Sequence, residues 1–208
     1  MVDIAKNHHA VLDTSRLAAA PSSMRAKVAA RRPADRAGPP APAPDTRSAT
    51  AARYLLAGIR IGLGWIFLWA FLDKVFGLGY ATTSAKSWLN GGSPTNGFLG
   101  AAKGPFSGFY HSIAGTGTAD VLFMAALLAI GTALLLGVGM RLAAVGGALL
   151  TIMMWTAVLP PTTNPFMDDH LIYAAVLIVL ALLGAGNTLG LGRAWAAIPL
   201  VQRAPWLK

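Results

Sequence analysis

Four long apolar runs dominate the sequence and restrict what the chain can fold into. They cover residues 54–72, 121–140, 142–159 and 171–191. Each is close to the roughly 20 residues that a helix needs to cross about 30 Å of hydrocarbon. No alternating strand pattern appears, and only helices or closed barrels satisfy their backbone inside a bilayer. We therefore predict an all-α fold, a bundle of four transmembrane helices at about residues 54–76, 120–140, 142–159 and 169–186.

The composition agrees with a lipid environment and excludes several kinds of chemistry. The chain is 55% hydrophobic and 12% charged, against about 25% charged in typical soluble domains. It contains no cysteine, which excludes disulfides, thiolate catalysis and iron–sulfur ligation by this chain. We predict no metal site and no intrinsic cofactor, so any electron chemistry would need a bound cofactor or a partner.

The N-terminal segment differs from the rest of the chain. Residues 1–52 are rich in Ala, Pro and Arg, with no sustained apolar face, so we predict a disordered basic tail. The chain has a formal net charge of +9, much of it in this tail. Next to a membrane span, such charge is typical of a topology signal. Without a folded basic face carrying interleaved aromatic residues, nucleic acid is not an expected partner.

The connections predict the order and orientation of the helices. The short turn around Arg141 predicts a tight hairpin, and Pro160 and Pro161 should end the third helix. Asp168 or Asp169 should then cap the fourth. In a four-span chain, the tail, the Arg141 turn and the segment 196–208 fall on one side. The positive-inside rule predicts a multi-pass protein of the cell (plasma) membrane with both termini in the cytoplasm.

Glycine spacing suggests where helices approach one another. Gly58 and Gly62 form a small-xxx-small pair in the first run, and Gly146 and Gly147 lie in the third. Small residues at such positions allow close helix contact in a membrane. We expect these glycines to lie at helix interfaces.

Charged residues near the first apolar run are candidates for function, because charge inside a bilayer is costly. Arg60 could bind a ligand or stabilise the bundle, or extend to the headgroups. Lys74 lies two residues after the end of the same run. At 1.5 Å per residue the two lie about 21 Å apart, so we assign them to different sites, with Lys74 at the outer face.

The outer face is expected to collect the remaining polar chemistry. We predict Asp169 and His170 as proton-handling catalytic residues, and Lys74, Asn164 and Asp168 as ligand-binding residues. The alternative is that these residues only cap a helix and shape an interface. The loop between the first two runs, with Phe98, Tyr110 and other aromatic residues, suggests an aromatic belt or a lid. A short interfacial helix around residues 106–113 is the alternative to the belt.

Several stretches together resemble the DoxX/DoxD-like membrane protein family over about residues 53–195. They are GIRIGLGWIFL at 58–68 followed by Asp73 and Lys74, WLNGGSPTNGF at 88–98, Asn164-Pro165, Asp168-Asp169-His170, Tyr173, GAG at 184–186 and LGLGR at 189–193. The resemblance implies a four-helix bundle and a quinone-linked role, as in the DoxD-type subunit of thiosulfate:quinone oxidoreductase. The second apolar run lacks the acidic residue that many members carry, and the tail lies outside the family pattern.

Two functions follow as hypotheses. The first is a subunit of a quinone-linked oxidoreductase system that binds quinone or a small substrate at the outer face. The second is a non-catalytic subunit that anchors or stabilises a larger respiratory or redox complex. Both place the chain in a lipid bilayer with a protein partner. A transporter is less favoured, because no inverted repeat is apparent.

Overall fold

The computed structural model describes residues 46–162 and 164–208. This part of the chain contains helices and turns and no β-strand. The predicted disorder of the tail falls mostly on residues 1–45, which lie outside the described residues.

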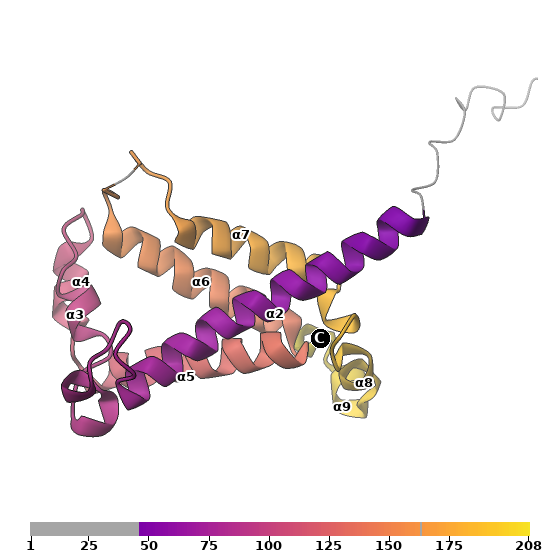
Figure 1. Ribbon diagram of the computed structural model, residues 1–208, viewed down its shortest axis with the longest axis horizontal. Coiled ribbons are helices and arrows are strands. Elements are labelled where there is room, and N and C mark those ends of the chain that lie inside the picture. Colours follow the sequence, from indigo (N-terminus) through magenta and orange to yellow (C-terminus); the bar gives the residue numbers. More distant parts are fainter. Residues whose placement is uncertain (1–45, 163) are drawn as a thin grey trace, which may run out of the picture. The chain divides into compact units, whose positions relative to one another are not determined.

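Four long helices form the body of the protein (Figure 1). They are α2 (Thr46–Phe76), α5 (Gly117–Leu136), α6 (Met140–Val158) and α7 (Asp169–Leu182). The first three are long and apolar enough to cross a membrane, as expected of a multi-pass membrane protein. α7 has 14 residues, which gives about 21 Å of helix.

Two of the helix boundaries that differ from the sequence prediction have a clear local cause. α2 begins at Thr46, so the expected end of the tail at residue 52 lies inside a helix. Alanine-rich sequence before Tyr54 continues the helix because alanine has the highest helix propensity. α7 ends at Leu182, because Gly184 adopts a left-handed φ of 63° and opens the turn η5 (Ala185–Asn187). The apolar run continues to residue 191, past this turn, so the hydropathy pattern did not indicate the end of the helix at Leu182.

The long helices pack most extensively as two pairs, α2 with α5 and α6 with α7, joined through α5 and α6. Their shared core contains large apolar side chains from all four helices, including Phe67, Met124, Leu134, Met140 and Leu177. The turn between α5 and α6 is tight, as predicted. Gly137 and Gly139 take left-handed φ values of 72° and 58° there.

Close packing of α2 on α5 uses glycines other than the expected pair. A Cβ on Gly64 would lie 2.9 Å from the Leu135 nitrogen, and one on Gly131 would lie 2.7 Å from the Leu68 nitrogen. Gly58 and Gly62 have nothing within 4 Å of a Cβ position. The backbones of α2 and α5 therefore meet at Gly64 and Gly131.

A helical cap covers the end of the bundle where α2 ends and α5 begins (Figure 1). It comprises η3 (Ser84–Lys86), η4 (Trp88–Asn90), α3 (Asn96–Leu99) and α4 (Ser107–Ile113). We call residues 77–116 the cap and this end of the bundle the cap end. Of the alternatives for this loop, the short helix around residues 106–113 is present as α4.

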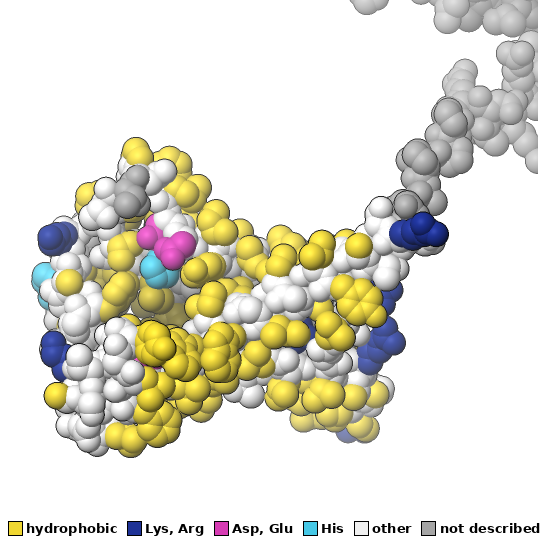
Figure 2. Space-filling model, in the orientation of Figure 1, with side chains coloured by type: hydrophobic (Ala, Val, Ile, Leu, Met, Phe, Trp, Pro, Cys, Tyr) yellow, Lys and Arg dark blue, Asp and Glu magenta, His cyan; other side chains and the backbone are white. Residues whose placement is uncertain are grey.

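The opposite end, which we call the basic end, carries the C-terminal helices α8 (Gly192–Ala197), α9 (Pro199–Arg203) and η6 (Pro205–Leu207). Arg141, at the start of α6, holds this segment: its backbone N–H donates to the Lys208 carbonyl at 2.7 Å, and its Nη1 donates to the Pro205 carbonyl at 2.8 Å. Figure 2 shows Asp and His side chains toward the cap end and a group of Lys and Arg at the other.

Candidate functional site at the cap end

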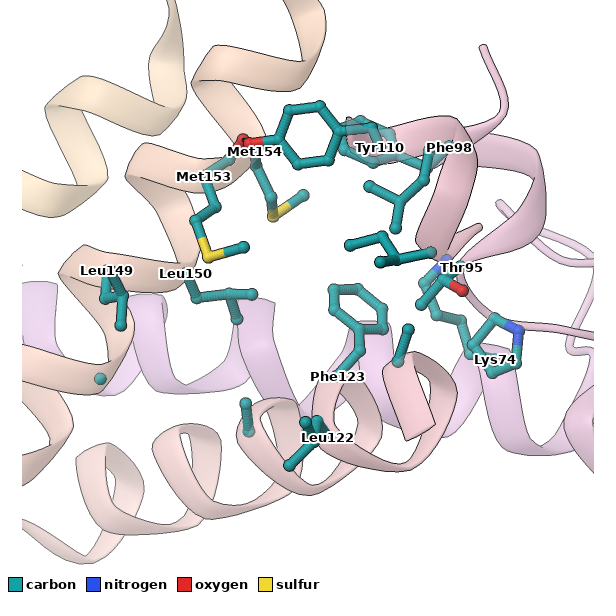
Figure 3. A pocket seen from close by; sticks show the side chains of 16 residues that line it. Lys74, Thr95, Phe98, Tyr110, Leu122, Phe123, Leu149, Leu150, Met153 and Met154 are labelled. Atoms are coloured by element: carbon teal, nitrogen blue, oxygen red, sulfur yellow. Dashed lines mark hydrogen bonds between the residues drawn. The ribbon is translucent and has the colours of Figure 1, made fainter. Parts of the chain in front are cut away.

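A pocket of about 480 Å³ lies where α5 and α6 diverge beneath the cap. α2 contributes Lys74 to its wall, α5 contributes Leu122 and Phe123, and α6 contributes Met153 and Met154 (Figure 3). The cap contributes further lining residues from α3 and α4 and their surroundings: Pro94, Thr95, Phe98, Leu99, Tyr110 and Ile113. This volume is in the range of small-molecule binding pockets.

Lys74 is the charged residue among those that line the pocket. Its Nζ lies 5.9 Å from the centroid of the Phe123 ring, close enough for a cation–π contact. Within residues 46–162 and 164–208, no hydrogen bond or salt bridge joins this ammonium group to another residue. Figure 3 places Lys74 and Thr95 on one side of the pocket and the methionines on another.

The other polar groups of the wall are already engaged in holding the cap. Thr95 Oγ1 donates to Asp120 Oδ1 at 2.6 Å, and the Thr95 backbone N–H donates to the same oxygen at 3.1 Å. Tyr110 donates its hydroxyl to the Met153 carbonyl at 2.9 Å and also bonds to Thr156. The cap is thus tied to α5 through Asp120 and to α6 through Tyr110. Among the polar side chains that line the pocket, the Lys74 ammonium is therefore the group that can still donate hydrogen bonds to a ligand.

The pocket continues onto the apolar surface of the bundle. Leu122 and Leu149 line it and are 65% and 61% exposed. In a membrane-embedded chain, such side chains contact acyl chains. A ligand dissolved in the bilayer can therefore reach this pocket without passing through water.

Asp168, Asp169 and His170 form a local group at the start of α7. Asp168 is the N-cap, as predicted: its Oδ1 accepts a hydrogen bond from the His170 backbone N–H at 2.7 Å and also contacts Nδ1 of that ring. Asp169 lies 3.4 Å from the same Nδ1. Their possible metal-ligating atoms lie within 4.8 Å of one another. The cap geometry accounts for this proximity, because the three residues are consecutive.

The pKa of Asp168 is set by this geometry. Burial alone would raise it, but hydrogen bonds from the backbone and ring of His170 outweigh that effect and hold the pKa below its ordinary value. The carboxylate therefore stabilises α7 fully above its unfolded pKa of about 3.9, and this contribution is lost as the pH falls through the lower folded value.

A pH series tests this assignment. The melting temperature of the wild type should exceed that of Asp168→Asn by a constant amount above about pH 4 and by less below it. Asparagine remains a good N-cap but does not titrate. Asp169→Asn is the matched control at an exposed neighbour. A difference that stays constant down to about pH 2.5 would show that the Asp168 charge does not support the cap.

The predicted site residues do not meet in one place. Phe98 lines the pocket, and its ring centroid lies 6.4 Å from that of His170. His170 and Asp169 are therefore near the pocket wall but not part of it. Asn164 shapes the loop before α7, where its Oδ1 accepts hydrogen bonds from the Phe166 and Met167 backbone at 3.2 and 3.0 Å.

Arg60 lies at the other end of the bundle and is fully buried. Its Nη1 donates to the carbonyls of Leu134 and Leu135, at the end of α5. Its Nη2 donates to those of Thr188 and Leu189, at 3.4 and 2.8 Å. This arrangement favours the bundle-stabilising role for Arg60 over the ligand-binding role.

Sequence reasoning missed the apolar side chains that form most of the pocket. Phe123, Met153 and Met154 lie within long apolar runs, where nothing separates a pocket residue from a core residue. The aromatic residues of the cap were a usable signal, since Phe98 and Tyr110 do line the pocket.

Comparisons with known proteins add no relative. No family model matches the chain, no curated protein matches it, and no solved structure matches it. The resemblance to DoxX/DoxD-like proteins thus stays a prediction from the sequence motifs.

Proposed function

We propose that this protein is a DoxX/DoxD-like, quinone-binding membrane subunit of a redox system. In this proposal α7 is the fourth membrane crossing, the cap faces outward and the basic end lies in the cytoplasm. The distribution of basic residues supports the orientation, since Arg141, Arg193, Arg203 and Lys208 belong to the basic end, against Lys86 and Lys103 in the cap.

The unpaired Lys74 ammonium in an apolar, lipid-facing pocket is the observation that carries the proposal. A quinone joins an apolar ring and tail to carbonyl oxygens that accept hydrogen bonds. The ring would lie among Phe98, Phe123 and the methionines, and Lys74 would donate to one carbonyl. The apolar tail would leave between Leu122 and Leu149.

Reduction of a quinone needs two electrons and two protons, and these come from different sources in this proposal. The chain has no cysteine, so a partner subunit would deliver the electrons. Asp169 and His170 would exchange protons with water beside Phe98.

Quinone binding by the purified protein in lipid nanodiscs tests the proposal. Titration with a short-chain quinone, followed by tryptophan fluorescence quenching, should give saturable binding. Lys74→Met should weaken it roughly 10-fold or more, because a hydrogen bond to a charged group contributes about 1.5–3 kcal/mol. Lys103→Met, which removes an exposed cation of the cap, should leave affinity unchanged. Equal affinities for wild type and Lys74→Met would contradict the proposal.

The anchoring alternative also has an observation in its favour. Several cap-end polar groups serve local structure: Asp73 accepts hydrogen bonds from the Tyr80 and Ala81 backbone at 3.3 and 3.1 Å, and Asn164 and Asp168 act similarly. Purification in mild detergent distinguishes the two functions. Stoichiometric recovery within a larger complex, with no quinone binding, would favour the anchor.

A further inference from the structure

A second pocket, of about 520 Å³, lies at the basic end beside the termination of α7. Arg53 and Leu56 of α2 form one wall, the turn 183–188 forms the floor, and Arg193 and Ala196 of α8 form the other wall. The pocket exists because α7 ends at Leu182, while the N-terminal part of α2, which begins at Thr46, extends beyond that point. Figure 1 shows α2 extending past the end of α7.

The charge of this pocket is positive. Arg53 and Arg193 are its charged residues, and Asn187 and Thr188 add polar groups. In the described part of the chain, neither arginine forms a salt bridge with a carboxylate. Two arginines facing one hollow without a counter-charge match a phosphate group, which guanidinium groups bind through paired hydrogen bonds.

The floor of the pocket is held rigidly from below. Arg60 Nη2 donates to the carbonyls of Thr188 and Leu189, at 3.4 and 2.8 Å. The Leu191 backbone N–H donates to the Leu136 carbonyl at 2.8 Å. The Arg60 bonds connect the turn to α2, and the Leu191 bond connects the segment after the turn to the end of α5. The backbone of Arg193, two residues after Leu191, is therefore held in place relative to α2 before a ligand binds.

Apolar side chains adjoin the arginines on the membrane side. Leu55, Leu182 and Leu183 are 68%, 78% and 62% exposed, and Leu183 also lines the pocket. A free phosphate ion would use the arginines but not these leucines. A phospholipid uses both, since its phosphate sits directly above its acyl chains.

We propose that this pocket is a binding site for the headgroup of an anionic phospholipid. Arg53 and Arg193 bind the phosphate, and the acyl chains lie along Leu182 and Leu183 at the end of α7. The site is separate from the cap-end pocket and does not depend on quinone binding there.

Native mass spectrometry of the full chain in detergent, with added phosphatidylglycerol or phosphatidylcholine, tests the site. The wild type should retain phosphatidylglycerol preferentially. The double variant Arg53→Gln/Arg193→Gln should lose this preference roughly 10-fold or more, because two cations that act on one anionic headgroup are removed. Circular dichroism spectra should show that the double variant keeps its helix content, since both arginines are exposed.

Arg203→Gln is the matched control, because it removes an exposed cation from the same end without touching the pocket. It should retain the wild-type preference. An equal loss in Arg203→Gln, or equal retention of both lipids by the wild type, would overturn the proposal. Displacement of the lipid by inorganic phosphate alone would also overturn it, since the site would then bind a free anion.

Discussion

Replacing Arg60 by methionine is expected to lower the free energy of unfolding by about 3 kcal/mol or more. The last carbonyls of a helix lack partners within the helix, and at the end of α5 the guanidinium supplies them. It also binds the turn after α7. Without it, the carbonyls of Leu135, Thr188 and Leu189 would lose their guanidinium donor, and a hydrogen bond to a charged group contributes about 1.5–3 kcal/mol. Unfolding in detergent, followed by circular dichroism, measures the loss.

Two further variants show which property of Arg60 matters. Arg60→Lys keeps the charge but has a single ammonium that cannot reach both segments at once, so its loss should be intermediate. Arg53→Met removes an exposed cation from the same helix and should change stability by less than about 0.5 kcal/mol. Wild-type stability in Arg60→Met would show that the guanidinium does not hold the basic end together.

Gly64→Ala is expected to destabilise the protein by about 1–3 kcal/mol, the usual cost of overpacking. The new methyl group would lie 2.9 Å from both the Leu135 nitrogen and the Leu134 Cβ. The backbone of α5 cannot move away like a flexible side chain, so α2 and α5 must separate. Thermal unfolding of the reconstituted protein measures the effect.

Gly62→Ala is the matched control, because Gly62 lies two residues before Gly64 in the same helix. A Cβ there has nothing within 4 Å, so the variant should gain up to about 1 kcal/mol from the better helix propensity of alanine. The two alanine variants should therefore move stability in opposite directions. Equal effects would mean that the α2–α5 crossing is not at Gly64.

The long helices and their local ends were predictable because each depends on neighbouring residues. The apolar runs predicted α5 and α6, the prolines predicted the end of α6 near Val158, and Asp168 was expected as a possible cap. These signals lie within one or two turns of the feature they determine. The hydropathy pattern could not predict that α2 begins at Thr46, because the residues before Tyr54 form a helix through the high helix propensity of alanine and not through an apolar run.

The packing and the site depended on contacts between distant segments, which the sequence alone does not carry. Gly62 and Gly64 look alike in sequence, and only the rotation of α2 against α5 separates a lipid-facing glycine from a buried one. Lys74, which the sequence marked as a cation at the end of an apolar run, lines the cap-end pocket, and its role as a ligand-binding residue stays a prediction. Asn164, which was expected to bind a ligand together with Lys74, instead accepts hydrogen bonds from the backbone of its own loop through its side-chain oxygen.

The two helix pairs have a mechanical consequence at the cap end. The pairs are joined by a glycine hairpin at the basic end, so α5 and α6 diverge from that turn and their far ends enclose the cap-end pocket. α6 has 19 residues and is about 28 Å long, so a rotation of about 5° at the hairpin moves its tip by about 2 Å. The Asp120 and Tyr110 contacts of the cap link the two tips and limit that opening.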